Sequence, residues 1–150
     1  MTSTIGKIAA GFSAMALMSA YAQGTVGEVL DAGGAKLQKA QVVAYVSDSK
    51  ATGLSASGQT EVNIDFKADG TFSGSVMSVA RNVKSSTSGR WVVDENGKTC
   101  TEGRLFDWNM STKECFYSYS IGTVIYRTAA DSEDRNTKVI KGSTTLAKIN

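Results

Sequence analysis

The chain contains no histidine and no proline, and it has only two cysteines. Without histidine it cannot use a Ser-His-Asp triad, a Cys-His pair or a histidine-ligated metal. The cysteines lack the C-x-x-C spacing of redox proteins, and no histidine is present to activate a thiolate. Without proline, the turns must be built from the 15 glycines and from serine and threonine. The composition therefore favours a non-enzymatic protein with glycine-built turns.

The start of the chain has the composition of a signal peptide. A lysine is followed by the apolar run Ile8–Ala20, and the small residues of Ala20-Tyr21-Ala22 predict cleavage before Gln23. The alternative is a membrane anchor, but the run is shorter than the roughly 20 residues that a spanning helix needs. We therefore expect a signal peptide at residues 1–22, one domain at residues 23–150, and a periplasmic or secreted protein with no stable membrane span after cleavage.

Charge and carboxylate spacing exclude several kinds of site. Without residues 1–22 the net charge is about +1, which gives no argument for nucleic acid or an anionic membrane as the partner. Glu61 and Asp65 would lie about 13 Å apart along one strand, wider than the carboxylate pairs of glycosidases. Asp131 and its acidic neighbours lack the spacing of an EF-hand and indicate a solvated loop. The sequence therefore predicts no catalytic residue, no metal site and no cofactor.

Alternating apolar and polar residues dominate the chain from Gly53 onward. Thr60–Phe66 and Thr71–Val79 flank an Asp-Gly turn, and Gly89–Val93 and Lys98–Leu105 flank an Asn-Gly turn, which are strong hairpin patterns. About six to eight strands after one helix predict a mainly β, α+β domain whose antiparallel sheet curls into a barrel or half-barrel. The remaining strands are expected at Glu114–Ser120, Thr123–Thr128 and Thr137–Ile140.

The best helix candidate is Ala35–Val46, because Leu37, Ala40 and Val43 fall near one helical face. A rival interpretation takes Gln41–Ser47 as a strand, since it holds three valines and a tyrosine. The last residues, 142–150, either add a strand or fray. Three other segments are expected to be loose, irregular or looped: Gln23–Gly34 (or a short strand), Arg81–Ser88, and Phe106–Lys113 (or an irregular strand).

The two cysteines and the aromatic residues gather in one part of the chain. Cys100 and Cys115 are expected to form a structural disulfide between neighbouring strands, which contributes about 3 kcal/mol in the loop-entropy model. Trp91 lies on a regular strand and is expected in the core, whereas Trp108 lies among polar residues and is the better candidate for exposure. The candidate binding residues are Asp107, Trp108, Asn109, Tyr117 and Tyr119.

Several of these motifs occur together in one known group of proteins. The chain has the aromatic-x-x-Asp-Gly turn Phe66–Gly70, the strand motif Gly89-Arg90-Trp91, the turn Asn96-Gly97, and then Cys100 and Cys115. In this it resembles a family of small exported proteobacterial proteins that share a domain of unknown function. The Gly-x-Trp motif is also similar to that of lipocalins. The resemblance spans about residues 66–126 and implies export and a lipocalin-like β-architecture, but no activity.

Together these observations predict a non-enzymatic exported binding protein. Its ligand would be either a small apolar molecule within the curled sheet or an envelope protein that contacts the rim of the sheet. The alternative is an inhibitor of a cell-envelope hydrolase, a lysozyme or a protease, in which the Cys100–Cys115 loop presents Trp108 and Asp107 to a cleft. An enzyme that uses carboxylates or a tyrosine is the least favoured interpretation, because no acid–base pair is visible.

Overall fold

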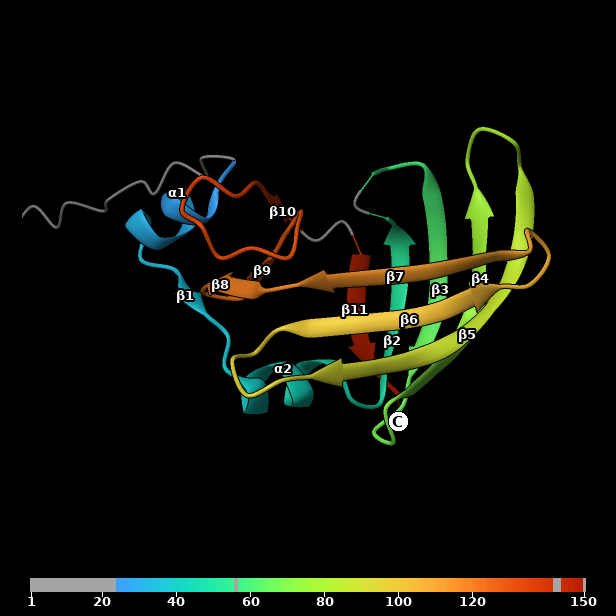
Figure 1. Cartoon of the computed structure of the whole chain (residues 1–150), viewed down its shortest axis with the longest axis horizontal. Coiled ribbons are helices and arrows are strands. Elements are labelled where there is room, and N and C mark those ends of the chain that lie inside the picture. Colours follow the sequence, from blue (N-terminus) through green and yellow to red (C-terminus); the bar gives the residue numbers. More distant parts are fainter. Residues whose placement is uncertain (1–23, 56, 142–143, 150) are drawn as a thin grey trace, which may run out of the picture.

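The structure, a computed structural model, describes residues 24–55, 57–141 and 144–149. Within these residues it is mainly β, as predicted, with two antiparallel sheets and two short helices (Figure 1). None of the described helices is long and apolar enough to cross a membrane. The predicted signal peptide lies outside the described residues. In chain order the elements are α1 (Val26–Asp31), β1 (Ala35–Lys36), α2 (Lys39–Val46), β2 (Ser49–Leu54), β3 (Thr60–Phe66), β4 (Thr71–Ser78), β5 (Val83–Val93), β6 (Thr99–Leu105), β7 (Met110–Phe116), β8 (Ser118–Ile121), β9 (Val124–Thr128), β10 (Val139–Lys141) and β11 (Thr144–Lys148).

The larger sheet is curled but open. Its strand order is β11-β2-β3-β4-β5-β6-β7, and Figure 1 shows β5, β6 and β7 crossing the direction of β11, β2, β3 and β4. The ring of Trp91 on β5 meets the ring of Phe66 on β3 edge-on, with 6.5 Å between their centroids. Among the described strands the sheet does not close into a barrel, because β7 pairs there with β6 alone and leads on into β8 of the second sheet. The half-barrel form of the prediction therefore describes it better than the closed form.

Phe72 packs against two glycines on the inner face of this sheet. Phe72 lies opposite Gly89, which in turn lies opposite Gly103 on the next strand. A Cβ atom at Gly89 would lie 2.5 Å from Cζ of Phe72 and 2.1 Å from the carbonyl oxygen of Glu102, and one at Gly103 would lie 2.6 Å from the same Cζ. The two positions therefore require glycine because another strand and an aromatic ring approach them closely.

Trp91 is part of the core, as the sequence predicts. Its side chain is 5% exposed, and its indole Nε1–H donates to the carbonyl oxygen of Lys67 at 3.0 Å. Its backbone N–H donates to the carbonyl oxygen of Gly70 at 2.8 Å. Trp91 thus fastens the Asp-Gly turn between β3 and β4 to the neighbouring strand β5.

The second sheet has the order β1-β8-β9-β10 and packs against α1. A capping box between Thr25 and Glu28 starts this helix, whose first N–H groups donate to the carbonyl oxygens of Thr137 (2.9 Å) and Arg135 (2.8 Å). The sheet and helix enclose a small core of their own. Its buried members are Val26, Val29, Tyr117, Tyr119, Tyr126 and Val139.

The helical predictions need two corrections. The segment Gln23–Gly34 is not loose where it is described, because residues 26–31 form α1; six residues are too few to show a helical period. The predicted helix Ala35–Val46 begins only at Lys39, since Ala35 and Lys36 pair with β8. The choice of helix over strand for Gln41–Ser47 is confirmed, as residues 41–46 are helical.

Two predicted loops are largely strand. Most of Arg81–Ser88 belongs to β5, in which Ser85 and Thr87 are buried on the inner face. Polar residues can fill such inner positions when they are hydrogen-bonded, and the hydroxyl of Ser85 donates to a backbone carbonyl at 3.1 Å. Of Phe106–Lys113, only residues 106–109 form a turn, and the rest is the start of β7.

Candidate functional site

Asp107, Trp108 and Asn109 lie together in the turn between β6 and β7. The turn is closed by a hydrogen bond of 3.2 Å from the N–H of Asn109 to the carbonyl oxygen of Phe106. Asn109 has a φ of 48°, a conformation that asparagine tolerates better than most residues, and its Oδ1 accepts from Arg104 at 2.5 Å. The three residues predicted from the sequence are thus brought to one hairpin tip, with Trp108 half-buried.

Asp107 holds this tip against the neighbouring strand β5. Its carboxylate accepts hydrogen bonds from the N–H of Ser86 at 2.7 Å and from the hydroxyl of Ser86 at 2.9 Å. Its own N–H donates to the hydroxyl oxygen of Ser85 at 3.1 Å. The bonds from Ser86, chiefly that of its backbone N–H, lower the pKa of Asp107 below its ordinary value. The carboxylate therefore positions the hairpin and is already engaged by the protein itself.

Removal of this carboxylate is expected to destabilise the tip in a pH-dependent way. Because folding lowers the pKa of Asp107, its contribution is present above the unfolded pKa of about 3.9 and is lost as the pH falls through the folded value. Asp107→Ala should therefore lower the melting temperature at pH 7, with the difference from wild type shrinking below pH 4. Thermal melts across pH measure this; Asp107→Asn keeps one acceptor oxygen and serves as the uncharged control. An equal difference at all pH values would contradict the role of the charge.

Tyr117 and Tyr119 lie in the core of the second sheet, away from the hairpin tip. Tyr119 is 2% exposed, and burial is the main cause that raises its pKa, followed by the charge of Glu133. The ammonium group of Lys36 lies 5.4 Å from the centroid of the Tyr117 ring and forms an ion pair of 2.5 Å with Glu133. Both tyrosines are therefore packed inside the protein, and the five candidate binding residues do not form one site.

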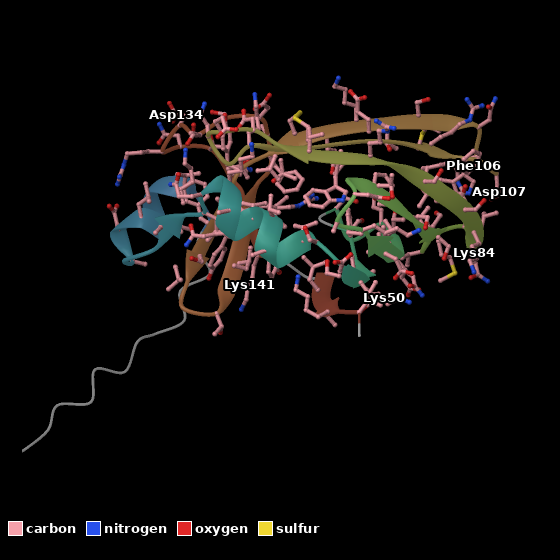
Figure 2. All side chains as sticks on the ribbon, turned by 90° about the horizontal axis from the view of Figure 1, so that it is seen from below. Lys50, Lys84, Phe106, Asp107, Asp134 and Lys141 are labelled. Carbon is pink, nitrogen blue, oxygen red and sulfur yellow. A yellow bond between two sulfur atoms is a disulfide. The ribbon has the colours of Figure 1, made fainter. Side chains whose placement is uncertain are left out.

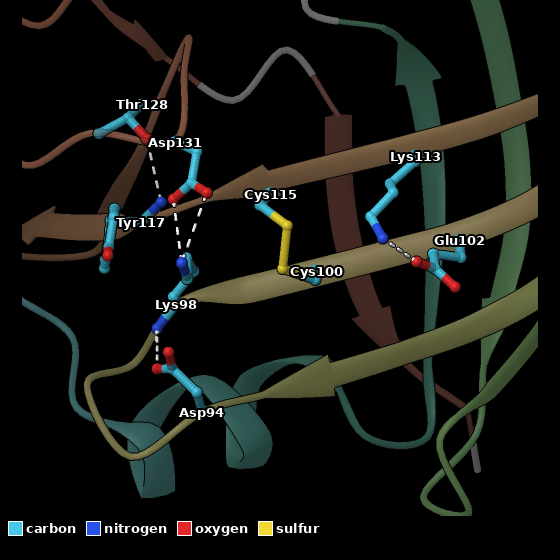
Figure 3. Close-up of a disulfide and its surroundings, with 9 residues drawn as sticks. All are labelled: Asp94, Lys98, Cys100, Glu102, Lys113, Cys115, Tyr117, Thr128 and Asp131. Carbon is cyan, nitrogen blue, oxygen red and sulfur yellow. Dashed lines mark hydrogen bonds and ion pairs between the residues drawn. A yellow bond between two sulfur atoms is a disulfide. The ribbon is translucent and has the colours of Figure 1, made fainter.

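The predicted disulfide between Cys100 and Cys115 is present. The two cysteines face each other across β6 and β7, with Cα atoms 4.1 Å apart (Figure 3). Residues on alternate positions share a face of the sheet, so the bridge lies on the same outer face as Val92, its neighbour on β5. Five residue pairs separate it from the hairpin tip, roughly 17 Å along the strands. The disulfide therefore fixes the edge strand β7, while Asp107 braces the tip.

The acidic loop predicted at residues 129–136 is held by ion pairs. Lys98 lies 3.4 Å from Asp131 (Figure 3), and the hydrogen bond and charge of Asp131 raise the pKa of Lys98. Arg135 forms an ion pair of 2.6 Å with Asp31 at the end of α1. In the described part of the chain, no three histidine, cysteine or acidic side chains gather closely enough to hold a metal ion. These ion pairs fasten the loop to α1 and to the turn that precedes β6.

Sequence reasoning missed a group of exposed apolar side chains at the two adjacent hairpin tips. Val79 and Val83 flank the turn between β4 and β5, and Phe106 and Met110 flank the turn between β6 and β7. Each is 46–52% exposed. The two hairpins are neighbours in the sheet, and the N–H of Phe106 donates to the carbonyl oxygen of Ser86, three residues along β5 from Val83, at 3.0 Å. We call these four residues the hairpin rim. In the sequence, the rim is indicated only by apolar residues that stand at strand ends beside turns.

A shallow open groove lies beside the hairpin rim. It has a volume of about 410 Å³ and runs over β2 to β5. Register places Leu54, Glu61, Met77 and Lys84 side by side on its four strands. The groove mixes apolar and charged side chains and shows no convergent set of catalytic groups. It extends the surface around the rim toward Leu54, which is 40% exposed.

No protein-family model, curated protein or solved structure matches the chain. We therefore infer its function from the packing, the charges and the exposed surfaces of the chain itself.

Proposed function

We propose that the protein is an exported, non-enzymatic binding protein whose contact surface is the hairpin rim. The observation that carries the proposal is that Val79, Val83, Phe106 and Met110, all about half exposed, lie at the tips of two hairpins that are neighbours in the sheet. Single exposed apolar residues are ordinary on soluble proteins, whereas contiguous groups mark interaction sites. The signal-peptide pattern and the disulfide support export, because oxidising compartments let such a bond persist.

A surface contact is favoured over a small ligand inside the curled sheet. The inner face is occupied by the rings of Phe66, Phe72 and Trp91, with Phe66 and Phe72 centroids 5.6 Å apart. Ala51 and Leu105 are buried on the same face. Ligand pockets for small apolar molecules are usually formed cavities, and this space is filled by the protein's own side chains. A partner that covers the rim therefore fits the packing better.

The proposal predicts that a photoreactive residue in place of Phe106 forms crosslinks to a partner in the cells that make the protein. The matched control is the same photoreactive residue in place of Val92, which is 61% exposed but lies on the outer face of β5 beside the disulfide. The crosslinks from position 106 should also disappear when Val83 is changed to serine. Gel mobility and mass spectrometry of the crosslinked species measure both effects. Equal crosslinking from positions 106 and 92 would count against the rim.

Inhibition of a cell-envelope hydrolase is the second candidate function. It is favoured by the bracing of the β6–β7 tip, since two hydrogen bonds from Ser86 fix Asp107 and thereby pre-organise Trp108 for insertion into a cleft. An inhibitor of this kind should lose potency against its lysozyme or protease target with Trp108→Ala and with Asp107→Ala. If no such enzyme is inhibited by the wild-type protein, this candidate is excluded.

A further inference from the structure

Three basic residues lie among the apolar residues of the hairpin rim. Arg81 is in the turn between Val79 and Val83, Lys84 follows Val83 directly, and Arg104 comes two residues before Phe106. Within the described residues, Arg81 and Lys84 form no ion pair, and Arg104 donates to the neutral side chain of Asn109. Among the described residues these three cations therefore form no ion pair, and the one carboxylate at the same tips, that of Asp107, is hydrogen-bonded to Ser86.

The opposite end of the molecule is different. Figure 2 shows Lys84, Phe106 and Asp107 at one end and Asp134 at the other. At the Asp134 end, three basic residues are paired with carboxylates: Lys36 with Glu133, Lys98 with Asp131 and Arg135 with Asp31. The net charge of the whole chain, +2, hides this difference. Unpaired positive charge and exposed apolar surface thus coincide at the hairpin rim.

We propose that the hairpin rim docks onto an anionic lipid surface; this rests on the proposed function, in which the rim is the contact surface. Basic side chains next to a membrane are attracted to anionic headgroups, and apolar side chains gain by burial at the boundary of headgroups and acyl chains. The rim offers both in one place. Arg81 and Lys84 bind lipid phosphates, while Val83 and Phe106 enter the apolar layer between them.

The shape of the rim favours lipid over a protein partner. Its apolar side chains stand on the tips of two protruding hairpins, and not in a pocket or on a flat face. Protein interfaces gain most of their binding energy from side chains that fill well-packed pockets in the partner. A lipid surface is deformable and accepts separate protruding side chains without a matching set of pockets. Half-buried Trp108, at the same tip, is of the residue type enriched at membrane–water interfaces.

The test measures binding to vesicles. The protein is used as the producing cell processes it, with vesicles of phosphatidylcholine alone or with phosphatidylglycerol added. We expect binding to the phosphatidylglycerol vesicles only, weakened by high salt. Changing Arg81 and Lys84 to glutamine should weaken it by about fivefold for each charge removed. The control changes Lys138 and Lys141 to glutamine. Both are exposed and lie at the second sheet, so the same charge is removed away from the rim and binding should be unchanged.

A local readout separates the rim from other parts of the chain. Brominated phosphatidylglycerol quenches tryptophans that reach the lipid, and we expect it to quench Trp108 but not buried Trp91. The variant Trp108→Phe should therefore lose the quenching. Absence of binding, equal binding to both kinds of vesicle, or equal loss in the rim and control variants overturns the lipid proposal. If the photoreactive residue at position 106 then still crosslinks specifically to a protein, the proposed function stands and only the lipid proposal fails. If it crosslinks to nothing, the proposed function and the lipid proposal both fail.

Discussion

Trp91→Ala is expected to lower the free energy of unfolding by about 3–5 kcal/mol, the range for a large aromatic residue removed from a core. Its indole ring is 5% exposed and meets the ring of Phe66, so its loss leaves a cavity between two parts of the curled sheet. The variant also removes the donor that reaches the carbonyl oxygen of Lys67. Urea denaturation followed by circular dichroism measures the change without depending on tryptophan fluorescence.

Two variants divide this effect into its parts. Trp91→Phe keeps an aromatic ring but loses the indole N–H, and it should cost less than alanine. Trp108→Ala removes the other tryptophan, which is half-buried at a hairpin tip, and should cost much less again. A loss for Trp91→Ala no larger than that for Trp108→Ala would mean that Trp91 does not hold the two parts of the sheet together.

Removing the disulfide, with Cys100 and Cys115 both changed to serine, is expected to lower the free energy of unfolding by about 3 kcal/mol, the value for a closed loop of this length. The bridge spans 15 positions of the sequence and joins β6 to the edge strand β7. A reducing agent should lower the stability of the wild type by a similar amount and leave the double variant unchanged. Urea denaturation with and without reductant measures both quantities.

The neighbouring pair on the same face provides a matched control. Glu102 and Lys113 form an exposed ion pair two residues from the cysteines on the same two strands, and therefore on the same outer face (Figure 3). Changing both to alanine should cost only about 0–1 kcal/mol, as for other exposed ion pairs. A wild type indifferent to reductant would show that β7 is held by its backbone pairing alone.

The sequence predicted best those parts of the fold that local patterns determine. The strand Thr60–Phe66 has the predicted bounds, and Gly97 of the Asn-Gly turn has the positive φ of 79° that such a turn needs. The pairing of Cys100 with Cys115 was also predicted, since the two had no other partner. Parts determined by distant contacts were missed. The pairing of Ala35 with β8 shortened the predicted helix, and the buried serine of β5, Ser85, made a strand look like a loop.

The candidate site shows the same division. Asp107, Trp108 and Asn109 were correctly grouped because they are adjacent in sequence, but the engagement of Asp107 by Ser86 depends on a strand about twenty residues earlier. Tyr117 and Tyr119 were predicted as binding residues, and only the packing of α1 over β8 and β9 shows that they are buried. The hairpin rim could not be predicted, since it requires two separate turns to be placed side by side.

The packing of Phe72 over Gly89 and Gly103 has a consequence for the ancestry of this fold. The three positions are far apart in sequence but form one steric unit, so they are expected to change together in evolution. A descendant that gained a side chain at position 89 or 103 would need a smaller residue at position 72 to accommodate it. Distant relatives should therefore be recognisable by a coordinated choice at these three positions even where the remaining sequence has diverged.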